Sequence, residues 1–139
     1  PPDIHKRLIE ETDFVQTYCL GQDMFASFHD CECVAAKFLD RRVLDYDPGL
    51  DPVTIADRVA DQCPNAPGVA GYGYNQCVGL YGWQMPVGLE SFCTCYGNSF
   101  SELYMKDPRS VIPNITGIGS ASLLRCSEKI EPNPLQLRN

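Results

Sequence analysis

Eight cysteines in two sets of four are the feature that most constrains what this 139-residue chain can fold into. Their number is even and they are spread along the chain, which favours a framework of disulfides over a single metal cage. The two sets have similar spacing, with separations of 12, 2 and 30 positions in the first and 16, 2 and 31 in the second. The first set is Cys19, Cys31, Cys33 and Cys63, and the second is Cys77, Cys93, Cys95 and Cys126.

Each set contains a Cys-x-Cys motif that we expect to lie on a helix. Residues i and i+2 point to nearly opposite sides of a helix, so the two sulfurs of a motif should bond to elements on opposite flanks. This excludes a bond between Cys31 and Cys33. Two pairings remain in the first set: Cys19 with Cys31 and Cys33 with Cys63, or Cys19 with Cys33 and Cys31 with Cys63. We favour the second pairing because Cys31 and Cys63 both lie on apolar stripes.

The spacing of apolar residues predicts a mainly α-helical, disulfide-stapled fold. In the first half we expect a helix over residues 1–21, ended by Gly21 in the left-handed conformation. A looped connection over residues 22–29 should follow. Asp30 should cap a second helix and Asp51, which precedes a proline, should cap a third.

The similar spacing of the two cysteine sets indicates two related four-cysteine units in tandem, as in a duplicated chain. We predict the second unit to be loop-rich, because turn-forming and β-branched residues fill 109–122 and leave helix only before Pro108 and around Cys126. The expected organisation is a helical unit over 1–63, a Pro/Gly-rich connection over 64–76, a second unit over 77–126 and an extended tail over 127–139.

The first set of cysteines lies in a pattern found in another group of proteins. Cys19, the run HDCECVAAKFLDRRV and the run IADRVADQC together resemble small exported bacterial proteins, mostly uncharacterised, with a Cys, a Cys-x-Cys that opens a helix and a later closing Cys. The resemblance covers residues 14–63, and residues 77–126 match the same pattern less well. It implies a disulfide-stapled helical unit outside the cytoplasm and implies no activity, so no functional residue is carried over.

The charge of the chain limits its partners. Eighteen acidic and eleven basic residues give a formal charge of −7. This charge repels the phosphate backbone of nucleic acids and disfavours adhesion to anionic lipid. No apolar run reaches the roughly 18 to 20 residues needed to cross a bilayer. Disulfides persist in oxidising compartments, so we expect a soluble periplasmic or secreted protein whose partner is another protein.

One aromatic segment is the best candidate for partner binding. Residues 71–92 place large side chains among glycines, and such aromatics are enriched at protein interfaces. The alternative is that these side chains fill the core of the second unit. The proline-bearing ends, 1–7 and 128–139, are also expected to lie against a partner. The predicted partner-binding residues are Tyr72, Tyr74, Tyr81, Trp83 and Met85.

The remaining chemical signals are sparse, and we expect no catalytic residue, cofactor or metal. His29 is interpreted as a surface histidine beside a capping aspartate, and Glu10 and Glu11 as a solvated face. Asn114 begins a glycosylation sequon, which would matter only in a eukaryotic secretory host. The sequence therefore favours a non-enzymatic accessory or structural subunit that docks on a larger assembly. The alternatives are a small redox or copper-handling protein that uses Cys-x-Cys pairs, and a secreted inhibitor or toxin-like binder.

Overall fold

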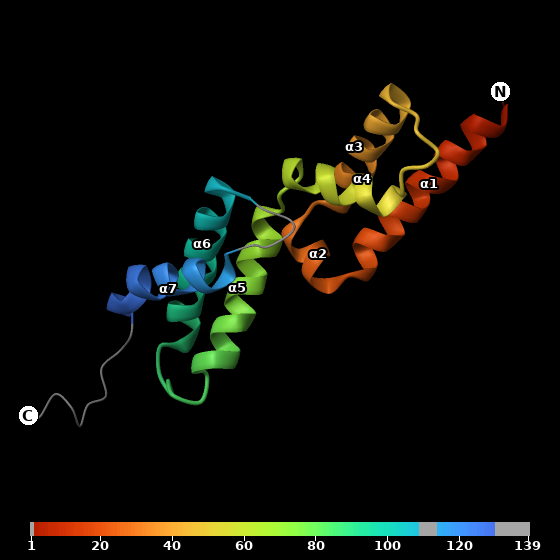
Figure 1. Cartoon of the computed structure of the whole chain (residues 1–139). Helices are drawn as coiled ribbons and strands as arrows, with labels where there is room; N and C mark the ends of the chain where they lie inside the picture. Colours follow the sequence, from red (N-terminus) through yellow and green to blue (C-terminus); the bar gives the residue numbers. More distant parts are fainter. Residues whose placement is uncertain (1, 109–113, 130–139) are drawn as a thin grey trace, which may run out of the picture. The chain divides into compact units, whose positions relative to one another are not determined.

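A computed structural model describes residues 2–108 and 114–129 of the chain (Figure 1). The described residues are mainly α-helical, as predicted, and β-structure among them is limited to one isolated antiparallel bridge between His29 and Pro64. The α-helices are α1 (Pro2–Gly21), α2 (Asp23–Phe28), α3 (Cys31–Leu44), α4 (Pro52–Val59), α5 (Ala66–Tyr81), α6 (Leu89–Lys106) and α7 (Ile115–Cys126). Two short 3-10 helices, η1 (Ala60–Gln62) and η2 (Ser127–Lys129), extend α4 and α7.

All eight cysteines form disulfides. The bridges join Cys19 with Cys31, Cys33 with Cys63, Cys77 with Cys93, and Cys95 with Cys126. Each Cys-x-Cys motif is therefore bonded to two different elements: α3 to α1 and to the segment after η1, and α6 to α5 and to α7. The reasoning from opposite helix faces is confirmed.

The pairing that we favoured for the first set is wrong. Cys31 is buried on the face of α3 that packs against α1, so it reaches Cys19. The backbone N–H of Asp30 donates to the carbonyl of Cys63 at 2.8 Å, which places the end of η1 beside the start of α3 and brings Cys63 to Cys33. Membership of an apolar stripe shows that a sulfur is buried, and it does not show which helix covers it.

The chain divides into two compact units, whose described parts are residues 2–68 with Pro108, and residues 69–107 with 114–129. Every disulfide closes within one unit. The division falls inside α5. No helix in the described part of the chain combines the length and the apolar character that crossing a bilayer requires.

The core of the first unit lies between α1, α3 and α4. The helix starts were predicted correctly. The side chain of Asp30 accepts a hydrogen bond from the N–H of Cys33 at 3.2 Å, and that of Asp51 accepts from Val53 at 3.1 Å with Pro52 in the first turn of α4. The buried residues of this core are Val15, Cys19, Cys31, Val34, Phe38, Ile55, Ala56, Val59, Ala60 and Cys63.

The connection between the first two predicted helices differs from the prediction. Residues 23–28 form α2 rather than a loop, and Gly21 stays within α1. The chain breaks instead at Gln22, whose backbone is extended (φ −106°, ψ 103°) and whose carbonyl accepts from Ala26 to start α2. Among the described residues only Gly88 has a positive φ, of 80°, at the N-cap of α6.

The predicted Pro/Gly-rich connection over 64–76 and the loop-rich second unit are also wrong. The proline and asparagine of this stretch are helix-start signals: the side chain of Asn65 accepts from the N–H of Gly68 at 3.1 Å, and Pro67 lies in the first turn of α5, where its missing N–H costs nothing. Helix α7 likewise begins at Ile115, earlier than predicted, because Asn114 caps it through the N–H of Gly117. Residues 109–113 of the predicted turn lie outside the described residues.

Two glycines of the second unit, Gly73 and Gly97, serve helix packing. A Cβ added at Gly97 on α6 would lie 2.5 Å from the carbonyl oxygen of Ala70 on α5, and one added at Gly73 would lie 3.1 Å from the Cα of Gly97. A side chain at Gly97 would force the two backbones apart, and one at Gly73 would also press on the Cβ of Phe100, at 2.9 Å. The glycines therefore let α5 and α6 cross with their backbones in close approach, next to the bridge between Cys77 and Cys93.

Candidate functional site

The structure separates the five predicted partner-binding residues. Tyr72 packs its ring against Phe100 with the centroids 5.8 Å apart. Tyr81 packs against Phe92 at 5.6 Å and Tyr96 at 6.4 Å. Both tyrosines are half-buried, and the three α6 rings that they contact are buried. Tyr72 and Tyr81 therefore pack against the aromatic core of the second unit. This agrees with the alternative to partner binding that the sequence analysis raised for the aromatic segment.

Trp83 has the opposite surroundings. It lies in the connection between α5 and α6, and its side chain is 81% exposed. Leu80, at the end of α5, and Val87, just before α6, are 50% and 60% exposed. We call Leu80, Trp83 and Val87 the hairpin tip. The other two predicted residues, Tyr74 and Met85, are half-buried.

The backbone of the hairpin tip is held by hydrogen bonds. The N–H of Gly82 donates to the carbonyl of Val78 at 2.9 Å, and the N–H groups of Gln84 and Met85 both donate to that of Tyr81, at 3.0 and 3.1 Å. These bonds fix the turn that carries Trp83, so its backbone needs little ordering when a partner binds.

A pocket of about 240 Å³ borders the hairpin tip within the second unit. Leu80 belongs to both features. One wall contains the side-chain oxygen of Gln76, which is buried and accepts no hydrogen bond from the described residues. Burial raises the pKa of Tyr96, and the nearby Tyr81 and Tyr72 add to this, so its hydroxyl stays protonated at neutral pH. The lining is uncharged and consists of Gln76, Leu80, Tyr81, Tyr96, Ile115, Thr116, Gly119, Ser120 and Leu123.

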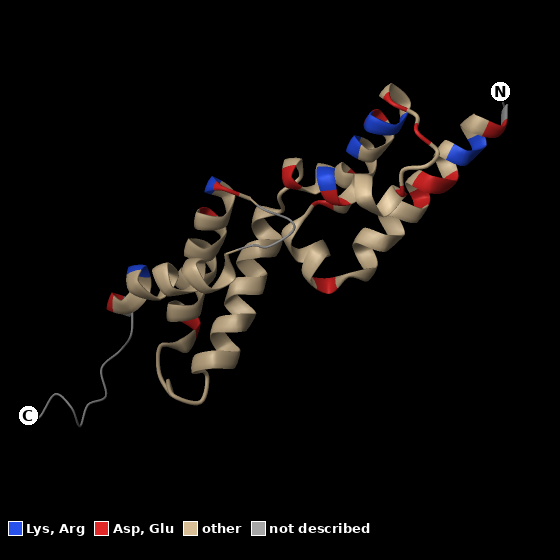
Figure 2. Cartoon of the chain, viewed as in Figure 1, with Lys and Arg blue, Asp and Glu red and all other residues tan. Residues whose placement is uncertain are grey.

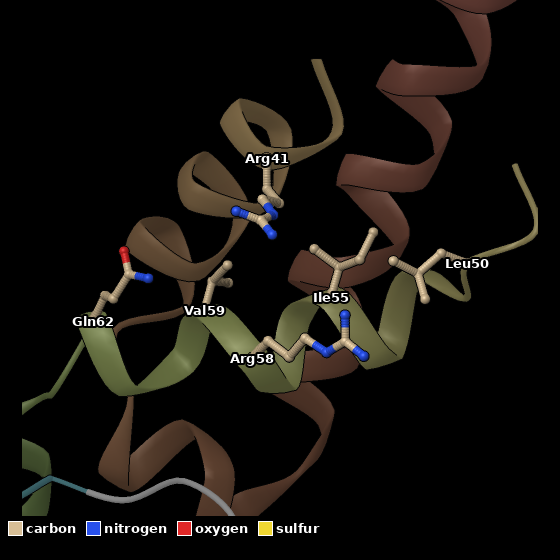
Figure 3. Close-up of a pocket in the computed structure, with 6 residues that line it drawn as sticks. All are labelled: Arg41, Leu50, Ile55, Arg58, Val59 and Gln62. Carbon is tan, nitrogen blue, oxygen red and sulfur yellow. The ribbon is translucent and has the colours of Figure 1, made fainter. Parts of the chain in front are cut away.

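The first unit contains a pocket of a different character, of about 210 Å³, between α3, α4 and the segment before α4 (Figure 3). Two guanidinium groups, from Arg41 and Arg58, and the amide of Gln62 lie around apolar side chains in the close-up. The apolar lining is Leu50, Ile55 and Val59. The sequence gives no sign of this pocket, because nothing in it brings α3 and α4 together at this point.

The net negative charge of the protein comes from residues 1–68, although acidic residues occur in both halves of the chain (Figure 2). Residues 1–68 contain thirteen acidic and six basic residues, whereas residues 69–139 contain five of each. The hairpin tip therefore belongs to a half of the chain with no formal net charge, and the arginine-lined pocket to a strongly acidic one.

The predictions for two polar residues of the first unit, Glu11 and His29, were wrong. Glu11 is not part of a solvated face: it binds Arg42, whose side chain is fully buried. His29 is buried, not on the surface, and it packs on the ring of Phe25 with the centroids 4.6 Å apart. Burial lowers the pKa of His29, while the charge of Asp61 and a hydrogen bond to the backbone of Ala60 oppose the shift. A charged residue inside an amphipathic helix gives no sequence signal of such burial.

The sulfur chemistry required by the redox and copper alternatives would need a bridge to open first, because every cysteine is bonded to another. In residues 2–108 and 114–129, no group of three or more His, Cys, Asp or Glu side chains is placed to hold a metal ion.

The fold defines a disulfide-stapled helical protein, and its four bridges indicate an oxidising, extracytoplasmic compartment. Comparison of the chain with protein-family models, with curated proteins and with solved structures finds no match.

Proposed function

We propose that this protein is an exported, non-catalytic accessory subunit that docks on a larger protein through the hairpin tip of its second unit. The observation that carries the proposal is the exposure of Trp83 on a hydrogen-bonded turn between two helices tied by a disulfide. Tryptophan is the residue type most enriched among those that dominate binding energy at protein interfaces. A large apolar side chain in water is otherwise a liability for solubility.

The pocket beside the hairpin tip supports the same proposal. Side chains that dominate an interface tend to pair with pockets, and the partner could fill this one while it buries Trp83. The lining of this pocket carries no charged side chain, so a partner side chain enters it without having to neutralise a charge. Because residues 69–139 have no formal net charge, an apolar contact there meets little electrostatic repulsion.

Export and bacterial origin are part of the proposal. The disulfides support export, and the likeness of residues 14–63 to small exported bacterial proteins supports membership of that group. The terminal segments were also expected to lie against the partner. Residues 2–7 form the first turns of α1, and residues 130–139 lie outside the described residues.

The test is competition for the native assembly. Extract from the source cell is fractionated by size exclusion, and we expect the protein to elute well above the 15.5 kDa of the isolated chain. Excess purified protein should displace the native copy from the large fraction, whereas Trp83→Ala should not, because truncation at such a position costs about 2 kcal/mol or more of binding free energy.

Leu44→Ala is the matched control, since Leu44 is 83% exposed and lies in the first unit. It should compete as well as the unmodified protein. Elution of the native protein as a free monomer, or equal competition by the Trp83 and Leu44 variants, would contradict docking through the hairpin tip. Docking on a protein would also be contradicted if the purified protein floated with phospholipid vesicles and bound no protein partner.

The inhibitor or toxin-like alternative is favoured by the same exposed tip on a stapled scaffold. It differs in what happens to the partner. An accessory subunit leaves the activity of its assembly intact or raises it, whereas a stoichiometric fall in the activity of the partner on addition of the purified protein would identify an inhibitor.

A further inference from the structure

The arginine-lined pocket of the first unit has a rigid apolar floor. Ile55 and Val59 lie one turn apart on α4 and are almost completely buried, at 2% and 6% exposure. Leu50 forms the rim, and its carbonyl oxygen accepts a hydrogen bond at 2.9 Å from the buried guanidinium of Arg42. The side chains of Ile55 and Val59 and the backbone of Leu50 are therefore positioned before any ligand arrives.

The two arginines at the pocket are not used by the fold. Both Arg41 and Arg58 are exposed, and neither makes an ion pair with a carboxylate of the described residues. Arg42, the next residue in the sequence, has a structural role in contrast to Arg41, because it is buried and makes four hydrogen bonds. Two unpaired guanidinium groups at one pocket stand out in a unit with thirteen carboxylates.

We propose that this pocket binds a small organic acid, with its carboxylate on Arg41 and Arg58 and a short branched or aromatic body on Leu50, Ile55 and Val59. Guanidinium groups bind carboxylates through charge-assisted hydrogen bonds, and the amide of Gln62 can donate a further one. The volume of about 210 Å³ is below the roughly 300 to 1,000 Å³ of pockets for drug-sized molecules, which restricts the body to a few carbon atoms.

The site is independent of the hairpin tip, since all of its residues belong to the first unit. It would give an accessory subunit a sensor for a metabolite or a second point of attachment.

The pocket should select for ligands that have both a carboxylate and an apolar body. A ligand with a carboxylate and no apolar body lacks the contacts with Leu50, Ile55 and Val59, and a ligand with a neutral head leaves both arginines unpaired.

The test uses the whole oxidised protein, labelled with nitrogen-15 and carbon-13, and isocaproate as the probe. We expect saturable shifts of the side-chain Nε–H signals of Arg41 and Arg58 and of the methyl signals of Ile55 and Val59. Acetate and isocaproamide should each bind about tenfold more weakly, because each retains only one of the two contacts. Replacement of both arginines, Arg41→Gln with Arg58→Gln, should weaken isocaproate binding by about tenfold or more.

Arg125→Gln is the matched control, because it removes one exposed guanidinium from the second unit and should leave binding unchanged. Circular dichroism and the count of blocked sulfurs show whether the double variant is folded. The proposal fails if isocaproate shifts no signal of the pocket, if acetate binds as tightly, or if Arg125→Gln loses as much affinity as the double variant. Binding of N-acetyl-glycyl-leucine more than about tenfold tighter than isocaproate would assign the site to a peptide C-terminus and overturn the free-acid proposal.

Discussion

Arg42 on α3 and Glu11 on α1 form a two-pronged ion pair, in which Nε and Nη2 of the arginine donate to the two carboxylate oxygens at 3.0 and 2.9 Å. The same guanidinium donates to the carbonyls of Asp47 and Leu50, at 2.7 and 2.9 Å, and lies over the ring of Tyr46. The hydrogen bond to Glu11 raises the pKa of Arg42 against the opposing effect of burial. One side chain thus ties α1, α3 and the segment before α4 together.

Glu11→Gln should lower the free energy of unfolding by about 3 to 5 kcal/mol, because it leaves the charge of Arg42 buried and uncompensated. Urea denaturation followed by circular dichroism measures this. Glu10→Gln is the matched control: Glu10 is exposed and makes only a 4.0 Å contact with Lys6, so the change should stay within about 0.5 kcal/mol. Equal effects of the two substitutions would contradict a structural role for the buried pair.

Gly97→Ala should destabilise the second unit by about 1 to 3 kcal/mol, since its Cβ would press on the backbone oxygen of Ala70 and force α5 and α6 apart. Gly79→Ala should instead stabilise the protein by up to about 1 kcal/mol, because this α5 glycine has open space around it and alanine favours helix. Thermal denaturation of both variants gives the comparison. A stabilised Gly97→Ala would mean that the helices do not cross this closely.

The first unit should lose stability as the pH falls below about 6.5, the unfolded pKa of histidine. Burial lowers the pKa of His29 in the folded protein, so the unfolded chain binds a proton that the folded chain does not. Stability is full above the unfolded pKa and is lost as the pH falls toward the folded pKa. His29→Gln should remove this dependence in denaturation curves, and His5→Gln, at an exposed position of α1, should keep it. A pH-independent stability of the unmodified protein between pH 5 and 7 would refute the assignment.

Digestion of the unreduced protein after Glu32 separates Cys31 from Cys33, so mass spectrometry can distinguish the two pairings of the first set. We expect Cys31 to remain linked to Cys19, and Cys33 to Cys63. Replacement of the second pair, Cys33→Ser with Cys63→Ser, should cost about 3 to 4 kcal/mol, as estimated for a loop of this length. Recovery of peptides that link Cys31 with Cys63 would contradict the structure.

Much of the fold could be predicted from the sequence wherever a local signal decided it. Asp30 and Asp51 cap helices because their side chains bond to backbone N–H groups two or three residues on, and a sequence shows that spacing directly. The opposite directions of the Cys-x-Cys sulfurs follow from helix geometry alone. The predictions failed where one pattern serves two purposes: Asn65, Pro67 and Gly73 suggest a loop when read one by one, yet together they start a helix and let it pack closely.

The candidate sites were harder to predict from the sequence, because they depend on which helices contact each other. Trp83 could be named from its residue type, but its exposure and the partial burial of Tyr81, two residues earlier, arise from the packing of α5 on α6. The pocket at Arg41 and Arg58 joins residues from two helices whose contact no periodicity reveals. The same holds for the buried pair of Arg42 and Glu11, which are 31 positions apart.

Because each set of four cysteines is paired within itself, the problem of oxidative folding is divided. Eight free thiols can combine in 105 ways, whereas two closed sets of four have three arrangements each. During the export that we propose, the first four cysteines emerge ahead of the others and can complete their bonds before a competing thiol follows. A chain of this kind has little need of an isomerase to correct mispaired intermediates between its halves.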